Sequence, residues 1–259
     1  MQKTVKSMDF NCDLAQGYGV YKNSTEYDFL DYVSSVNISC GFHAGDPLTI
    51  KRALLAAKEK NIVIGAHIGY SDIQGFGYRT VELSDEELEA LVIYQVGAIM
   101  QFAKAYNLEI EHVRPHGAMY KKASEDFHFS VVLARSIQKC SKWLTYYGSA
   151  GDVLVKTGDY VGIPIAREVI LEKQYNQNMQ IEYGLADVTD TELCLKRIQT
   201  ILQSSQVNNT SDGLTSVEVD SIHFSNKYPN SVEIIKSANE LITPEPVRYG
   251  RVKTSGWVD

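Results

Sequence analysis

The chain has 259 residues, of which 44% are hydrophobic and 22% are charged. A chain of this length and composition can bury a sizeable core, which excludes a globally disordered protein. Its formal net charge of −7 reflects 32 acidic and 25 basic residues. This acidic balance argues against a protein that binds nucleic acid or an anionic membrane.

The chain carries no recognisable targeting or membrane segment. Residues 1–14 have no apolar run behind their lysines, so they do not predict a signal peptide. The longest apolar stretch, 90–103, is interrupted by two glutamines and is too short to cross a bilayer. We therefore expect a cytoplasmic protein. The cysteines form no CxxC pair, so we expect free and mostly buried thiols at Cys12, Cys40, Cys140 and Cys194.

Seven short β-type runs alternate with helical patterns along the chain. They cover residues 8–14, 36–40, 62–67, 110–115, 143–147, 166–170 and 219–224. This alternation predicts a parallel α/β sheet, and about seven units in one chain favour a closed or nearly closed barrel. A doubly wound open sheet is the alternative.

The helices have clear start signals. Asp46 before Pro47 is typical of an N-cap, and Ser84 and Thr189 each precede a glutamate three residues on, as in a capping box. The helix that Thr189 opens is expected to reach about residue 202. The other predicted helices cover residues 48–60, 88–103, 124–139 and 231–241. The polar segment 204–213 is expected to be a surface loop.

Polar residues gather where the expected strands end. Asn11 and Asp13 share one face of the first strand, because they are two residues apart. His43, His67 and His116 follow or close the next three strands. One such histidine alone could simply bond a loop carbonyl. Because the carboxyl ends of parallel strands form the active-site face of α/β folds, the set indicates a convergent site.

Alternatively, these residues bind a divalent metal, with Asp13, His67 and His116 as its ligands. No HxH or HxxxH spacing fixes two ligands locally, so the sequence leaves the metal open. We expect His112 to have a structural role and His128 to be solvated on a helix. His223 is a secondary candidate for the site.

Phosphate-binding motifs are missing. Residues 151–157 match a P-loop only superficially, because Val155 stands where the glycine before the lysine is required. We therefore do not expect this chain alone to bind or hydrolyse ATP.

Four segments closely resemble the LamB/YcsF family, the family of 5-oxoprolinase A subunits. They are residues 11–14 (NCDL), 33–47 with the block CGFHAGDP, 64–67 (IGAH) and 113–120 (VRPHGAMY). The resemblance implies a distorted (β/α)7 barrel-like single domain over residues 1–259. It also implies the ATP-dependent hydrolytic opening of 5-oxoproline (pyroglutamate) to L-glutamate. In that system partner subunits B and C activate the lactam with ATP, and this chain completes ring opening.

For this reaction we assign catalytic roles to Asp13, His43, His67 and His116. Substrate-binding roles are assigned to Asn11, Asp46, Arg114 and Tyr120. Asp13 and His116 would be the base and its orienting group, in an order that the sequence leaves open. The Arg114 fork suits a carboxylate or phosphoryl oxygen, and Asp46 is also expected to cap its helix.

The chain departs from the family pattern around this core. Ala15-Gln16-Gly17 replaces Gly-Glu-Gly, and Leu171-Glu172-Lys173 replaces Ala-Asp-Arg. Tyr78 and Ser225 also differ from the family residues. The alternatives are therefore a stand-alone metal-dependent amidohydrolase or deacetylase, or a non-catalytic paralogue with a regulatory or scaffold role. Homo-oligomerisation is left open.

Overall fold

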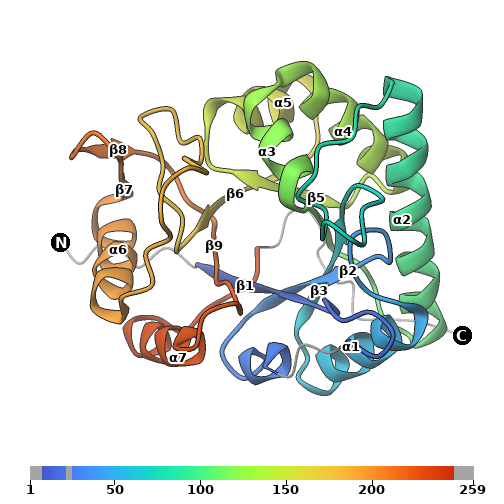
Figure 1. The fold of residues 1–259 in the computed structure, drawn as a ribbon, viewed down its shortest axis with the longest axis horizontal. Coiled ribbons are helices and arrows are strands. Elements are labelled where there is room, and N and C mark those ends of the chain that lie inside the picture. Colours follow the sequence, from blue (N-terminus) through green and yellow to red (C-terminus); the bar gives the residue numbers. More distant parts are fainter. Residues whose placement is uncertain (1–7, 22–24, 248–259) are drawn as a thin grey trace, which may run out of the picture.

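Seven parallel strands close into a barrel that is surrounded by helices (Figure 1). This computed structural model describes residues 8–21 and 25–247, so half of the segment considered as a signal peptide, residues 1–7, lies outside the described residues. The barrel strands, in order around it, are β1 (Asp9–Leu14), β2 (Ser35–Ser39), β3 (Val63–Ile68), β4 (His112–Pro115), β5 (Thr145–Ser149), β6 (Ile165–Ile170) and β9 (Ser221–His223). Because β9 pairs with β1, the predicted barrel is confirmed and the open sheet is excluded.

The helices with start signals are present where the sequence predicts them, as α1 (Pro47–Glu59), α2 (Asp85–Ala105) and α6 (Thr191–Ser204). The helix predicted over 231–241 without such a signal is present as α7 (Ser231–Leu241). Asp46 accepts hydrogen bonds from two backbone N–H groups of α1, and Ser84 forms the expected capping box with Glu87. The predicted cap of α6 is wrong. Asp190, not Thr189, accepts the N–H of Leu193, because its carboxylate stands directly before the first helical residue.

Three helical elements differ from expectation. The helix predicted over 124–139 is present as α4 (Phe127–Cys140), which begins later because Asp126 caps it, whereas α3 (Gly117–Glu125) before it was not predicted. A helix α5 (Asp152–Val161) and a 3-10 turn η1 (Glu26–Phe29) were not predicted.

The loop predicted over 204–213 is also wrong in part. Strands β7 (Gln206–Asn208) and β8 (Leu214–Ser216) pair there as an antiparallel hairpin outside the barrel. The Asn209 side chain accepts the N–H groups of Ser211 and Gly213 and so closes the turn, while Val207 is buried. This local hydrogen bonding gives the polar segment a regular structure.

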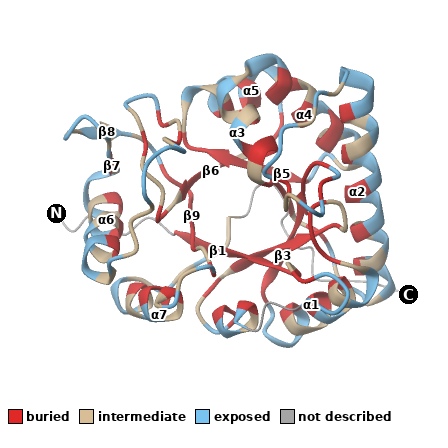
Figure 2. Ribbon diagram, viewed as in Figure 1, coloured by how far each residue is buried: buried red, intermediate tan, exposed pale blue. Residues whose placement is uncertain are grey.

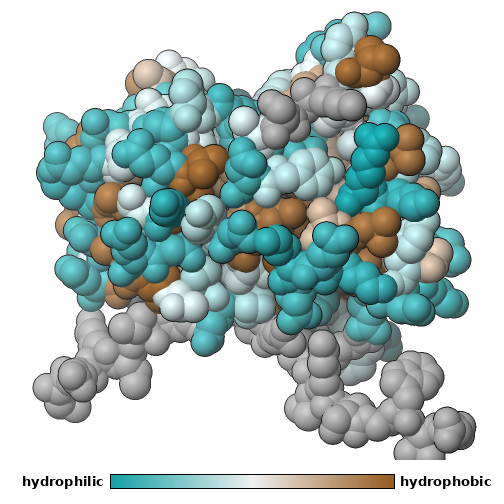
Figure 3. Space-filling model, turned by 90° about the horizontal axis from the view of Figure 1, so that it is seen from below, coloured by the Kyte–Doolittle hydropathy of each residue, from teal (hydrophilic) through white to brown (hydrophobic). Residues whose placement is uncertain are grey.

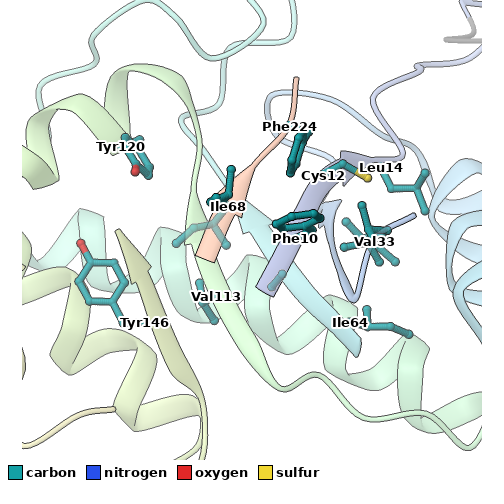
Figure 4. Close-up of a cluster of buried hydrophobic side chains, with 14 of the residues drawn as sticks. Phe10, Cys12, Leu14, Val33, Ile64, Ile68, Val113, Tyr120, Tyr146 and Phe224 are labelled. Carbon is teal, nitrogen blue, oxygen red and sulfur yellow. The ribbon is translucent and has the colours of Figure 1, made fainter. Parts of the chain in front are cut away.

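The hydrophobic core lies between the barrel and its helices. Buried residues concentrate on the strands and on the inner faces of the helices (Figure 2). Along β1, Phe10, Cys12 and Leu14 belong to this outer core, and the Phe10 and Phe224 rings meet edge to face at 4.9 Å between centroids (Figure 4). From the side of α7 and α1, the outer surface is largely hydrophilic (Figure 3). Within the described ranges no helix is long and apolar enough to cross a membrane.

The barrel interior is polar. Hydrogen bonds join strands that are not neighbours: Tyr147 on β5 donates to Asp9 on β1, and Arg114 on β4 binds Glu168 on β6. Such contacts can only cross the lumen. A buried polar group is costly unless it is hydrogen-bonded, so this network specifies how the strands close. Gly65 is part of the same fit, because a Cβ there would lie 2.0 Å from the His112 ring that fills the lumen.

Candidate active site

Asp13 lies at the centre of the site at the carboxyl ends of the strands and contacts several of its side chains. Its Oδ1 accepts the amide of Asn37 at 3.1 Å, and its Oδ2 accepts the amide of Gln16 at 3.3 Å. Arg114 Nη1 lies 3.4 Å away. Burial alone would raise the pKa of Asp13, but the positive charges of neighbouring histidines and Arg114 hold it well below its ordinary value. Asp13 is therefore an ionised carboxylate at neutral pH.

Arg114 is committed to carboxylates within the protein. Its Nε lies 2.9 Å from both oxygens of Glu168, and its Nη2 lies 2.8 Å from Oε2. Glu168 also accepts the Asn11 amide at 3.0 Å and is fully buried. Burial opposes the charge of both partners, yet the pair keeps the pKa of Glu168 lowered and that of Arg114 raised. Glu168 and Asp13 together therefore balance the positive charge of the Arg114 guanidinium before any ligand enters the cavity.

The hydrogen atoms on His67 and His116 are fixed by backbone carbonyls. His116 Nε2 donates to Phe76 O at 2.7 Å, and His67 Nδ1 donates to Arg114 O at 3.1 Å. The opposite nitrogens, His67 Nε2 and His116 Nδ1, lie 3.0 Å apart, and Asp13 Oδ1 lies 3.3 Å from His67 Nε2. With both rings neutral, three acceptor atoms converge with no hydrogen between them. A positive charge is therefore needed there, either an additional proton between the two rings or a metal cation.

His43 lies behind His116 and not beside the convergence point. The two rings stack with centroids 4.1 Å apart and planes within 8° of each other. His43 Nε2 lies 3.2 Å from Ser39 Oγ, and its Nδ1 has no hydrogen-bond partner among the described residues. Burial, followed by the neighbouring His67, holds the pKa of His43 well below its ordinary value. His43 is therefore a neutral packing partner of His116 in this arrangement.

The stacking decides which residues could hold a metal. Ligand atoms of His43, His67 and His116 lie within 4.8 Å of one another. However, an imidazole lone pair lies in the plane of its ring, so two stacked rings cannot both direct theirs at one ion. Asp13, His67 and His116 are the alternative set, because His67 Nε2 lies 3.0 Å from His116 Nδ1 and 3.3 Å from Asp13 Oδ1, close to the roughly 3.4 Å expected between neighbouring ligands of a tetrahedral zinc site.

The segment after β3 holds His116 in place. Asp72 accepts the N–H groups of Gly75 and Arg79 and pairs with the Arg79 side chain, which shapes the turn. Gly77 has φ +72°, and a Cβ there would lie 2.8 Å from the side chains of both His43 and His116. The glycine thus allows the backbone to close directly over the histidines.

A cavity of about 100 Å³ opens beside these groups. A water needs about 10–15 Å³ by the same measure, so the cavity has room for several waters or one small molecule. Its wall combines acids and bases with a set of tyrosines. The ionisable groups are Asp13, Arg114, His116, Glu172, Lys173, Asp187, His223 and Lys227, and the tyrosines are Tyr78, Tyr120, Tyr183 and Tyr228.

The structure brings most of the predicted site residues together. The cavity is lined by Asp13, Arg114, His116 and Tyr120, and Gln16 lies beside them. His67 and His43 are fully buried behind this wall. Asn11 lies deeper in the lumen, where its Oδ1 is 2.8 Å from His223 Nδ1. Asp46 caps α1 and accepts the N–H of Gly19, and it is not among the residues that line the cavity.

The remaining histidines behave as expected. His112 is buried in the lumen and bonds Asn37 at 2.8 Å, whereas His128 is exposed and pairs with Asp85. His223 lines the cavity 3.7 Å from Asp13 Oδ2, and burial lowers its pKa to about 4. All four cysteines are free, and three of them are buried.

Several site residues were not predicted. Glu168 holds Arg114 across the lumen, Asn37 holds Asp13 from the neighbouring strand β2, and Lys227 reaches the cavity from the segment after β9. Glu168 and Asn37 could have been found from the sequence, because each is a polar residue inside a β-type run. A polar side chain that points into the barrel indicates a polar lumen. Lys227 lies in a polar turn and carries no comparable signal.

A closed parallel barrel with an Asp–His–His cluster and a cavity at its carboxyl ends defines an α/β-barrel of the enzyme type. The model of the LamB/YcsF family matches residues 8–255, so the chain belongs to this family. It is 42% identical over 171 residues to the 5-oxoprolinase A subunit of Bacillus subtilis, a match that covers 66% of each chain. It is 32% identical to the 5-oxoprolinase A subunit of Geobacillus thermodenitrificans over 94% of this chain and 96% of the relative.

A solved structure has the same fold. The lactam utilization protein of Thermus thermophilus superimposes with a TM-score of 0.86 at 30% identity, covering 94% of this chain and 100% of that one.

Proposed function

We propose that this chain is the A component of an ATP-dependent 5-oxoprolinase and opens 5-oxoproline to L-glutamate with partner subunits B and C. The observation that carries the proposal is the ionised Asp13 beside His116 on the wall of a cavity sized for a small molecule. Relatives named as the A subunit of 5-oxoprolinase, together with a lactam utilization protein, support the choice of substrate.

Ring opening needs a water, a base and an electrophilic carbonyl carbon. Asp13 lines the cavity as a carboxylate and His116 lines it as a neutral imidazole, because the pKa of each lies well below its ordinary value. Asp13 can hold a water and accept its proton, but a carboxylate of lowered pKa is a weak base. The chemistry therefore requires either an activated substrate or a more acidic water.

Activation by ATP on the partner subunits meets the first requirement. A phosphorylated lactam oxygen makes the carbonyl carbon more electrophilic, so a weak base is sufficient. This division of work agrees with the sequence, in which no phosphate-binding loop is present.

Lys227 is the cavity cation best placed to bind the substrate carboxylate. Its Nζ bonds the Tyr78 hydroxyl and has no carboxylate partner among the described residues. Arg114 is already paired with Glu168, and Lys173 is paired with Asp187 at 2.8 Å. We therefore assign carboxylate binding to Lys227 first, with Arg114 and Tyr120 forming the adjacent wall.

A metal-dependent amidohydrolase that acts alone is the second candidate. The three acceptor atoms of Asp13, His67 and His116 favour it, because they converge with no hydrogen between them. A divalent cation held there would supply Lewis acidity and lower the pKa of a bound water. In that case Asp13, His67 and His116 act as ligands, and the other cavity residues bind and orient the substrate.

The test is glutamate release from 5-oxoproline by the purified chain, alone and with partner subunits B and C of a related bacterium plus ATP. We expect release only in the complete mixture, and no micromolar ATP binding to the isolated chain by calorimetry. Release by the chain alone with added Zn²⁺ or Mn²⁺ would favour the second candidate. No release in the complete mixture, when the relative's own A component is active there, would indicate a non-catalytic paralogue.

A further inference from the structure

Glu172 is a cavity residue whose carboxyl group is only half satisfied. It follows β6, is 1% exposed and lines the same cavity as Asp13. Its Oε1 accepts the backbone N–H of Ser225 at 3.0 Å, whereas its Oε2 has no hydrogen-bond partner among the described residues. Leaving a buried polar atom unpaired costs about 1–3 kcal/mol. A group that bears this cost on a cavity wall is a candidate to meet a ligand.

The two carboxyl groups on this cavity lie in opposite environments. The pKa of Glu172 is raised from 4.5 to about 7, mainly by burial and less by Asp187, although the Ser225 N–H and Lys173 oppose the change. Asp13 is buried too, but its neighbours hold its pKa well below the ordinary value. One carboxyl is thus substantially protonated near pH 7 and the other is ionised, which is typical of an acid and base pair.

We propose that Glu172 is the general acid that protonates the leaving ring nitrogen. This role rests on the proposed function. As the bond between the carbonyl carbon and the ring nitrogen breaks, its electron pair stays on nitrogen, and the proton on Glu172 Oε2 moves to that nitrogen. The water oxygen remains on the carbonyl carbon, one of its protons passes to Asp13 and the other to solvent, and solvent supplies the remaining protons of the amine. The phosphoryl group that activated the lactam stays on the carboxyl oxygen as an acyl phosphate, which a second water hydrolyses to the carboxylate of L-glutamate and inorganic phosphate. Glu172 is left as a carboxylate and regains a proton from solvent before the next turnover.

The surroundings of Glu172 fit a group that exchanges protons. Lys173 is held by Asp187 at 2.8 and 2.9 Å, so its charge is largely compensated and does not force Glu172 into its ionised form. The titratable and charged groups that act on Glu172 come from its own segment, the 182–190 segment, α6 and the segment after β9, namely Lys173, Asp187, Cys194, Arg197 and Tyr228.

Substrates with different leaving groups test whether Glu172 acts as a general acid or has only a structural role. The lactam nitrogen must gain a proton to leave, whereas the sulfur of the matching five-membered thiolactone carboxylate leaves as a thiolate. In the complete system, Glu172→Gln should slow lactam opening by roughly 10²-fold or more and leave thiolactone opening little changed. Glu172→Asp should recover part of the lactam activity. Glu26→Gln is the matched control, because Glu26 is also buried, has a pKa raised to about 7 and does not line the cavity.

The pH profile gives a second readout. Because the acid must carry its proton, wild-type lactam opening should fall as pH rises through about 7, and this limb should be absent in Glu172→Gln. The infrared band of a protonated carboxyl group at pH 6 should weaken in the same variant and persist in Glu26→Asp.

The outcomes are distinguishable. Equal loss of lactam and thiolactone opening in Glu172→Gln, or no loss of either, overturns the acid role and leaves the proposed function intact. A wild-type chain that opens the thiolactone but not the lactam, or neither ring, in the complete system overturns the proposed function and this role with it.

Discussion

His67 Nε2 and His116 Nδ1 lie 3.0 Å apart, although each ring already donates its other N–H to a backbone carbonyl. Two neutral imidazoles in this arrangement would place lone pairs against each other, and Asp13 Oδ1 adds a third acceptor 3.3 Å from His67. The space between these three acceptor atoms therefore favours a positive charge. Whether a proton or a metal cation satisfies it decides between the two candidate functions.

Divalent metal is expected to stabilise the chain if a cation satisfies this point. Zn²⁺ or Mn²⁺ at a hundredfold excess over its dissociation constant should add about 2.7 kcal/mol to the free energy of unfolding. His116→Ala removes one acceptor and should abolish the increase, whereas His128→Ala, on the exposed face of α4, should retain it. Thermal unfolding with and without metal measures both. An identical melting temperature for the wild type in both conditions would assign the charge to a proton between His67 and His116.

Asp13→Asn should lower ring opening by roughly 10²-fold or more, because the amide cannot accept the proton of water. The variant also leaves Arg114 with Glu168 as its remaining carboxylate partner, so some loss of stability is expected. Circular dichroism distinguishes the two effects. A folded variant with full activity would show that Asp13 has no catalytic role, and an unfolded one would show that its main role is to organise the barrel.

Lys227→Met should raise the KM for 5-oxoproline with a smaller effect on kcat, because a carboxylate anchor binds ground state and transition state alike. A charge-assisted hydrogen bond contributes about 1.5–3 kcal/mol, which corresponds to roughly 10- to 150-fold in KM. Lys196→Met is the control, since Lys196 is an exposed α6 residue that pairs with Glu192. Steady-state kinetics in the complete system supply both constants. A loss confined to kcat would assign carboxylate binding elsewhere.

The strands could be predicted because they are short β-type runs, many of which are followed by glycine, proline or a polar residue. Helices α3 and α5 could not, since the residues at their N-caps are His116 and Gly151, neither of which makes a side-chain cap. A helix whose first turn is satisfied by tertiary contacts leaves no local signal. The wrong cap of α6 has a different cause, because two capping residues, Thr189 and Asp190, stand next to each other there.

The site residues at the ends of strands could be predicted from the sequence. The residues that meet only because the barrel closes could not. Asp13 and His116 lie at strand ends, so topology alone brings them together. Glu168 meets Asn11 across 157 positions of sequence, through the pairing of β6 and β1 with β9. A glutamate in a strand is more often solvent-exposed, so its role depends on a closed lumen that periodicity does not reveal.

Asp9 should make the chain less stable as pH rises from about 4 to 6. It lies fully buried in the lumen, and burial raises its pKa from 3.8 to about 6 despite hydrogen bonds from Ser34, Ser35, Ser221 and Tyr147. The folded state therefore binds a proton that the unfolded state releases in this range, so its stability falls with pH. The difference corresponds to roughly 3 kcal/mol. Urea unfolding at several pH values should show a steeper fall in stability over this range in the wild type and in Asp159→Asn, an exposed α5 position, than in Asp9→Asn, where the raised pKa values of Glu26 and Glu172 leave a shallower slope. An unchanged slope in Asp9→Asn would contradict the assignment.

Gln16 tests whether the chain has drifted from its relatives in substrate. Its amide donates to Asp13 Oδ2 at 3.3 Å and lines the cavity, so this departure from the family pattern lies in the site itself. Gln16→Glu places a second carboxylate against Asp13, and their repulsion should raise the pKa of one of them and provide a stronger base. If 5-oxoproline is the substrate, turnover with partner subunits should rise and its acidic limb should move to higher pH. If the cavity binds a different anion, the added charge should instead weaken that ligand. Paired assays of wild type and Gln16→Glu, with and without partners, measure both. Unchanged turnover and binding would mean that the contact between Gln16 and Asp13 has no part in the reaction.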